Sequence, residues 1–135
     1  MIRYLLDTNI CIAMIRGRSD AVVAKLRRHK IGSVGISSIT LAELQHGVAK
    51  SSDPGRNAVA LAHVVAPLEV LPFDVRAAAA YGRVRAGLER KGTPIGPLDT
   101  LIAAHAVALG VTLVTSNERE FARVTGLRVE NWLSR

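Results

Sequence analysis

Three acidic residues, Asp7, Glu43 and Asp99, stand near the starts of predicted helices, each shortly after a strand or a turn. Parallel strands place such positions at one edge of a sheet, where the three carboxylates can meet. Like charges brought together repel one another unless cations neutralise them. Carboxylate oxygens without His or Cys select Mg²⁺ or Mn²⁺ over zinc. The pattern therefore indicates a divalent-cation site of the kind that hydrolyses phosphodiesters, in which metal ions activate water and stabilise the leaving oxygen.

Each acid also has an ordinary structural interpretation. Asp7 can cap the helix that follows it. Glu43 fits a capping box with Thr40, although a helix that starts two or three residues before Thr40 leaves the Glu43 carboxylate free to enter a cleft. Asp99 lies in a first helical turn, where the helix dipole favours a negative charge. The metal-site interpretation depends on all three acids occurring together in a strongly basic chain.

A second polar segment, Thr115-Ser116-Asn117, follows the apolar run 111–114. It fits a helix cap followed by a solvated turn, and it also fits a support for a metal site at the same sheet edge. The Asn117 side chain can hold a metal-bound water but supplies no negative charge. The histidines do not show metal-ligand spacing, and His105 lies in apolar surroundings typical of a core or helix-face histidine.

The charge of the chain is strongly positive. Its 135 residues carry a formal net charge of +7 and a pI of about 10.5. Such a charge fits a solvated basic surface, but its distribution is uneven, with concentrations in residues 1–30 and 76–91. Polyanions bind surfaces of this kind through the release of counterions. The charge therefore favours a polyanionic partner.

Short apolar runs alternate with helical patterns. Strands are expected at 2–6, 34–36, 70–71, 111–114 and 127–129, and helices at 8–16, 20–30, about 38–50, 54–65, 75–90 and 97–110. This alternation predicts one α/β domain over residues 1–135, with a central, mainly parallel sheet flanked by helices. Gly110 is expected to end its helix as a C′ glycine.

The composition indicates the cellular compartment in which the protein is expected. Hydrophobic residues make up 49% of the chain and aromatic residues only 4%, which leaves few aromatic platforms for base stacking. The single cysteine, Cys11, cannot form an internal disulfide and is expected to be a small buried hydrophobe in a reducing cytosol. No apolar run approaches the ~20 residues of a membrane span, and the N-terminus lacks the pattern of a signal peptide. A cytoplasmic protein is expected.

Taken in order over the whole chain, these motifs resemble the PIN-domain superfamily and, within it, the VapC toxins. Each motif is common by itself, and their order and spacing make the resemblance specific. The motifs are Leu6-Asp7-Thr8-Asn9, 37–44 (SSITLAEL), 96–103 (GPLDTLIA), 113–121 (LVTSNEREF) and 124–132, which ends in Trp132. The resemblance implies a PIN-like three-layer sandwich.

The resemblance also implies functional residues. Asp7, Glu43 and Asp99 would bind one or two Mg²⁺ or Mn²⁺ ions and carry the catalysis. The residues that would support this site are Thr8, Asn9, Thr115 and Asn117. Many relatives carry Asp at the position of Asn117, and Glu120 is the nearest acidic substitute, unless it faces solvent. Independently of the resemblance, the basic charge of residues 1–30 predicts that four arginines bind the RNA backbone: Arg16, Arg18, Arg27 and Arg28.

VapC toxins are ribonucleases that a VapB antitoxin inhibits by placing its C-terminal segment in the cleft. They commonly form homodimers, and they reach operator DNA only through VapB. The motifs of this chain are most similar to those of the subgroup that cuts initiator tRNA in the anticodon loop. The resemblance therefore implies the toxin of a type II toxin–antitoxin module.

Two other functions remain open on the sequence. One is a PIN-like scaffold that binds RNA or a partner without cutting, against which the three intact acids argue. The other is a small phosphomonoesterase. Phosphatases similar to the haloacid dehalogenases carry D-x-D after the first strand, whereas here Asn9 takes the place of the second Asp.

Overall fold

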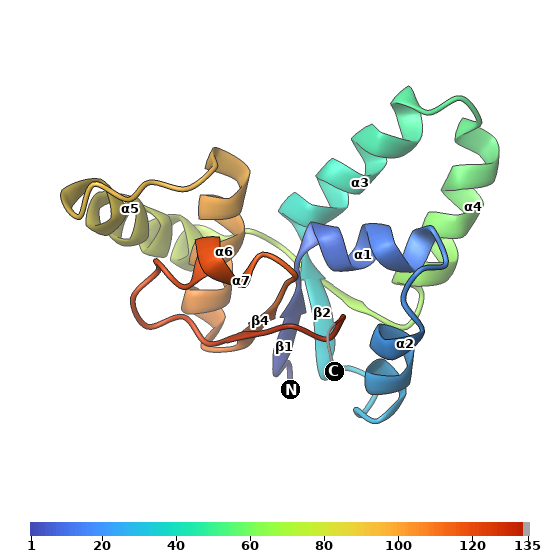
Figure 1. Ribbon diagram of the computed structural model, residues 1–135, viewed down its shortest axis with the longest axis horizontal. Coiled ribbons are helices and arrows are strands. Elements are labelled where there is room, and N and C mark those ends of the chain that lie inside the picture. The colour runs from blue at the N-terminus through green and yellow to red at the C-terminus, as the bar shows by residue number, and fades with distance from the viewer. Residues whose placement is uncertain (134–135) are drawn as a thin grey trace.

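The computed structural model describes residues 1–133, and its centre is a five-stranded sheet in the order β3-β2-β1-β4-β5. Figure 1 labels its central strands β1, β2 and β4. Every pairing in this sheet is parallel, so the prediction of a mainly parallel sheet is confirmed. The last two residues of the predicted domain 1–135 lie outside the described residues. The strands are β1 (Tyr4–Leu6), β2 (Val34–Ser37), β3 (Glu69–Leu71), β4 (Thr112–Val114) and β5 (Val129–Glu130).

Helices cover both faces of the sheet, which gives the expected three layers (Figure 1). The first face carries α1 (Thr8–Ile15), α2 (Asp20–Arg27), α3 (Ser38–Lys50) and α4 (Pro54–Val65). The other carries α5 (Val75–Arg90), α6 (Pro97–Leu109) and the short α7 (Glu118–Phe121). None of the helices in residues 1–133 is both long and apolar enough to cross a membrane.

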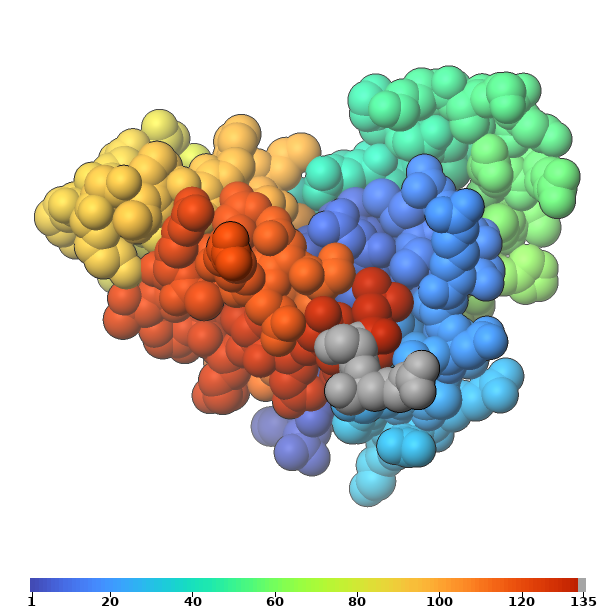
Figure 2. Space-filling model, in the orientation of Figure 1, coloured from blue at the N-terminus to red at the C-terminus, as the bar shows by residue number. Residues whose placement is uncertain are grey.

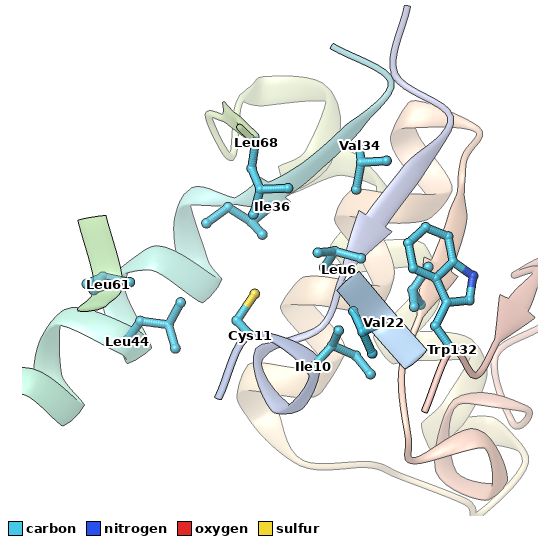
Figure 3. Packing of buried hydrophobic residues seen from close by; sticks show 11 residues of the cluster. Leu6, Ile10, Cys11, Val22, Val34, Ile36, Leu44, Leu61, Leu68 and Trp132 are labelled. Atoms are coloured by element: carbon cyan, nitrogen blue, oxygen red, sulfur yellow. The ribbon is translucent and has the colours of Figure 1, made fainter. Parts of the chain in front are cut away.

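Side chains alternate along each strand, so the buried residues form two clusters, one on each face of the sheet. Leu5 of β1 packs with Ile102 and Phe121 on one face. Leu6, the next residue, belongs to the opposite cluster, which also contains Cys11 and Trp132 (Figure 3). Burial raises the pKa of the Cys11 thiol to about 12, so this cysteine is the inert buried hydrophobe that was expected.

The boundaries of most elements agree with the sequence pattern to within one or two residues. Gly110 ends α6 in the left-handed region at φ 69°, which confirms the predicted C′ glycine. The predicted helix 20–30 ends three residues early, at Arg27, and a turn containing Gly32 at φ 91° leads into β2. The helix α7 was not among the predicted helices, because four residues are too few to show a helical period, although 115–117 was also interpreted as a helix cap.

Gly35 of β2 lies where the sheet leaves no room for a side chain. A Cβ at this position would come within 2.6 Å of the carbonyl oxygen of Glu69 on β3. We expect Gly35→Ala to lower the free energy of unfolding by about 1–3 kcal/mol, because strand β3 must shift. Gly47→Ala is the control: its Cβ meets nothing within 4 Å, and an alanine should stabilise helix α3 by about 0.5–1 kcal/mol. Urea denaturation measures the free energy of unfolding of both variants. Equal effects would show that strand β3 leaves room for a side chain at Gly35.

Candidate active site

The candidate site lies where β1 and β4 end side by side. Leu6 pairs with Val114 across the two strands, so the next residues, Asp7 and Thr115, become neighbours. The Thr115 hydroxyl donates a hydrogen bond of 2.7 Å to Asp7 Oδ2, and the Thr8 amide donates one of 2.8 Å to Asp7 Oδ1. Asp7 is 2% exposed. Asp7 therefore caps helix α1, as its structural interpretation predicts, and it is also a buried carboxylate at the sheet edge.

Glu43 reaches the same edge from α3. This helix is capped by Ser37, whose hydroxyl accepts from the Ile39 amide, and Glu43 falls in its second turn. The Glu43 carboxylate accepts a hydrogen bond of 2.8 Å from the Thr8 hydroxyl. The capping box with Thr40 was wrong, because α3 begins at Ser38 and Glu43 bonds to a side chain of α1.

Asp99 enters from the first turn of α6, which Pro97 opens. Burial raises the pKa of Asp99 to about 7, and the negative charges of Asp7, Glu120 and Glu43 contribute to this shift. Burial also raises the pKa of Asp7, although its hydrogen bonds from Thr115 and Thr8 oppose the shift. These four carboxylates, hereafter the acidic cluster, are therefore close enough to affect one another's ionisation.

Glu120 is the fourth member, which the sequence suggested only as the nearest acidic substitute for the Asp that many relatives carry at position 117. It lies on α7, where one carboxylate oxygen accepts a hydrogen bond of 3.0 Å from the Gly96 amide and the other accepts from the Asn117 side chain. The Asn117 backbone amide donates to the Thr115 hydroxyl at 3.0 Å. Glu120 thus faces the cluster rather than solvent, and its spacing of three residues from Asn117, about one helical turn, was the available signal.

The other polar residues are less involved. Asn9 is exposed on α1 and takes no part in the hydrogen bonds that link the acidic cluster. His105 is buried, and its Nδ1 is hydrogen-bonded to the Ser37 hydroxyl at 2.8 Å. Burial lowers the pKa of His105. The prediction of a satisfied core histidine is confirmed.

No cationic side chain neutralises the acidic cluster within the described residues. Residues 1–133 contain two ion pairs, Arg76–Asp74 and Arg85–Glu89. Both are exposed and lie in the α5 region, outside the acidic cluster. The carboxylates are turned toward hydroxyl and amide donors, and residues 1–133 contain no ready-made group of three His, Cys, Asp or Glu ligands. The donor set nevertheless consists of oxygens alone, which suits a hard divalent cation.

Comparison with known proteins shows the family to which this chain belongs. The model of the PIN domain family matches residues 4–127. The chain is also 44% identical, over 98% of its length and 99% of the relative, to the tRNA(fMet)-specific endonuclease VapC of Shigella flexneri. The chain belongs to the VapC family of PIN domains. This VapC chain is likewise 44% identical to Ribonuclease VapC2 of Rickettsia felis, over 96% of its own length and 97% of the relative.

Solved structures of VapC proteins share the whole fold. The crystal structure of DNA-bound VapBC from Salmonella typhimurium superposes with a TM-score of 0.93 at 43% identity, covering 98% of this chain and 99% of the other. VapBC2 from Rickettsia felis, bound to a promoter DNA fragment, gives a TM-score of 0.92 at 43% identity, with the same coverage.

The four arginines predicted to bind RNA do not lie beside the acidic cluster of this PIN domain. Arg16 and Arg18 follow the C-terminal end of α1, an eight-residue helix of about 12 Å whose N-terminus carries Asp7. Arg27 and Arg28 end α2 and precede the start of β2, at the opposite edge of the sheet. All four are exposed. They remain candidates only for contacts with the RNA backbone at a distance from the acidic cluster.

Proposed function

We propose that this chain is the toxin of a type II toxin–antitoxin module, a divalent-cation-dependent endoribonuclease that a VapB antitoxin inhibits. The observation that carries the proposal is the acidic cluster, which gathers at one sheet edge in a protein of net charge +7. The basic surface attracts a polyanion, and bound cations allow its phosphate to approach the carboxylates. The names of the relatives, ribonuclease and tRNA(fMet)-specific endonuclease, support the same chemistry.

The acidic cluster would hold Mg²⁺ or Mn²⁺. Asp7, Glu43 and Asp99 are the ligands expected from the sequence, and Glu120 adds the fourth carboxylate that Asn117 does not supply. When bound, such an ion activates water and stabilises the leaving oxygen of the phosphodiester. The oxygen-only donor set disfavours zinc.

The residues around the carboxylates orient them. Thr115 and the Thr8 amide each occupy one oxygen of Asp7, which leaves further lone pairs on both oxygens for a cation. Through its hydroxyl, Thr8 also restrains Glu43, and the Asn117 amide restrains Glu120. These contacts support the proposal that Thr8, Thr115 and Asn117 hold the carboxylates in orientation without carrying charge.

The substrate we propose is RNA, with initiator tRNA as the first candidate because relatives that are 43–44% identical bear the name tRNA(fMet)-specific endonuclease. The partner we propose is a VapB antitoxin, since VapBC complexes share the fold over 98% of this chain. Binding to operator DNA would then pass through the antitoxin, and the toxin would form a homodimer.

The direct test is cleavage by the purified protein. We expect Mg²⁺-dependent cutting of initiator tRNA, no cutting by Glu43→Gln, and no hydrolysis of p-nitrophenyl phosphate. Hydrolysis of the ester without RNA cleavage would identify a phosphomonoesterase instead. RNA binding without cleavage in either Mg²⁺ or Mn²⁺ would identify a non-cutting scaffold.

Asn117→Asp tests the place of this residue in the cluster. The change replaces an amide that donates to Glu120 with a second carboxylate, so it adds like-charge repulsion without metal and a ligand with metal. We expect Mg²⁺ affinity, measured by calorimetry, to rise about tenfold, and stability in EDTA to fall. Asn131→Asp is the matched control, because the Asn131 amide faces Glu118 outside the cluster. Weaker Mg²⁺ binding by Asn117→Asp would place Asn117 away from the metal.

A further inference from the structure

A small pocket lies next to the acidic cluster, between helix α5 and the segment that leads into α6. Its volume is about 220 Å³, less than the ~300 Å³ of the smallest sites for drug-sized ligands. Leu88 and Ile95 give it apolar walls, together with Pro94 and Pro97. Its polar groups are Tyr81, Arg85, Glu89 and Thr100.

The segment 94–97 is the wall that this pocket shares with the acidic cluster. A Cβ on Gly96 would lie 3.7 Å from Asp99 Oδ2 and 3.9 Å from Glu120 Oε1, so Gly96 faces the acids. Its neighbours Ile95 and Pro97 line the pocket. One stretch of backbone therefore separates the pocket from the acidic cluster.

Arg85 lines the pocket and is hydrogen-bonded to two other residues of α5. Its guanidinium donates to the Tyr81 hydroxyl at 3.0 Å and to Glu89 at 3.3 Å, one helical turn away in either direction. The Arg85 side chain remains 58% exposed, so part of this planar group stays open to a ligand. A guanidinium restrained in this way presents a flat surface on which a planar ring can stack.

The charge balance indicates which part of a nucleotide would enter. The positive charge of Arg85 is paired with Glu89, so the pocket offers little net attraction to a phosphate. Its proline, leucine and isoleucine walls favour an uncharged, planar, largely apolar group. RNA bases that are not stacked in a helix bind proteins in this manner, on aromatic rings or on arginine planes.

We propose that this pocket binds one unpaired base of the RNA substrate, next to the phosphate that is cut, with Arg85 as the stacking platform and Pro94, Ile95 and Pro97 as the opposite wall. The proposal rests on the ribonuclease function proposed above. It makes Arg85 a determinant of specificity, because a base held in a helix cannot enter and cleavage is directed to single-stranded RNA.

The test is a scan of abasic nucleotides through the anticodon stem-loop of initiator tRNA. In the wild type, one abasic position beside the cleavage site should lower kcat/KM by about ten- to a hundredfold, the loss expected for one stacked base. Arg85→Ala should cause a similar loss on intact RNA and no additional loss at that position. Arg85→Lys keeps the charge but not the plane, and should behave like Arg85→Ala.

Arg90→Ala is the matched control, because it removes the same charge from an exposed position of α5 outside the pocket. This variant should retain the full abasic penalty. Circular dichroism of each variant checks folding, and exposed Arg85 is not needed for the core.

Three outcomes would overturn the proposal while leaving the ribonuclease function intact. Arg85→Ala could leave every rate unchanged, or it could slow intact and abasic RNA equally. It could also weaken inhibition by the purified antitoxin with no change in cleavage, which would assign the pocket to a protein partner. A wild type that cuts no RNA at all would instead refute the proposed function, and this inference with it.

Discussion

Asp99→Asn is expected to abolish RNA cleavage and, in the absence of metal, to make the folded protein more stable near neutral pH. Burial and the charges of Asp7, Glu120 and Glu43 raise the pKa of Asp99 to about 7, whereas the unfolded chain titrates near 3.9. The folded wild type therefore binds more protons, and its stability declines as pH rises from about 4 to about 7. Asparagine stays neutral, so the variant lacks this decline.

Urea denaturation in EDTA at pH 5 and pH 8 measures the effect. Because Asp99 is only half-buried, solvent screening limits the gain to about 1 kcal/mol at pH 8, with a smaller gain at pH 5. Asp20→Asn, which removes an exposed acid of α2 outside the acidic cluster, is the control for the change of charge. If the stability difference between Asp99→Asn and wild type does not grow with pH, the neighbours of Asp99 do not raise its pKa.

The loss of activity should be far larger than the change in stability. Removing one ligand of the metal site should reduce the cleavage rate at least about a hundredfold, because the charge stabilised in the transition state depends on it. Affinity for uncut RNA should persist, since a negative charge facing phosphate has been removed. If cells expressing the variant at wild-type level still stop growing, Asp99 does not take part in catalysis. Loss of RNA binding together with toxicity would favour a non-cutting scaffold.

The sequence was sufficient to predict that Asp7, Glu43 and Asp99 lie at one sheet edge, because each follows a strand or turn and begins a helix. It could not show which strands are neighbours. The hydrogen bond between Thr115 and Asp7 exists because β4 lies directly beside β1, and this strand order depends on how the helices pack. The contact from Thr8 to Glu43 likewise depends on how α1 lies against α3.

The positions of Glu120 and the basic residues relative to the acidic cluster could not be predicted from the sequence. Glu120 faces the cluster because α7 brings it to the Gly96 amide, 24 residues away in the chain. Its spacing of three residues from Asn117 relates it to that residue but does not reveal the contact with Gly96. Arg27 and Arg28 are close to Asp7 in the sequence, yet α2 carries them to the other edge of the sheet. Charge counted along the chain gives the sign of the surface but not the side on which it lies.

Removal of divalent metal is expected to reduce RNA cleavage to background, because the acidic cluster has no other source of positive charge in residues 1–133. Mg²⁺ or Mn²⁺ added after EDTA should restore the activity, whereas Zn²⁺ should not, since the cluster contains no His or Cys. Mg²⁺ at a hundred times its dissociation constant should also stabilise the protein by about 2.7 kcal/mol.

The same binding should depend on pH in a way that identifies the ligands. A cation requires Asp99 in its ionised form, and this carboxyl has a pKa of about 7 in the metal-free protein, so Mg²⁺ must displace a proton as it binds. Mg²⁺ affinity should therefore weaken as pH falls from 8 to 6. Calorimetry in two buffers of different ionisation enthalpy measures the proton released, and Asp99→Asn should release less. Full cleavage in EDTA with no added metal would refute the metal site, and Mg²⁺ binding that releases no proton would show that the ion does not contact Asp99.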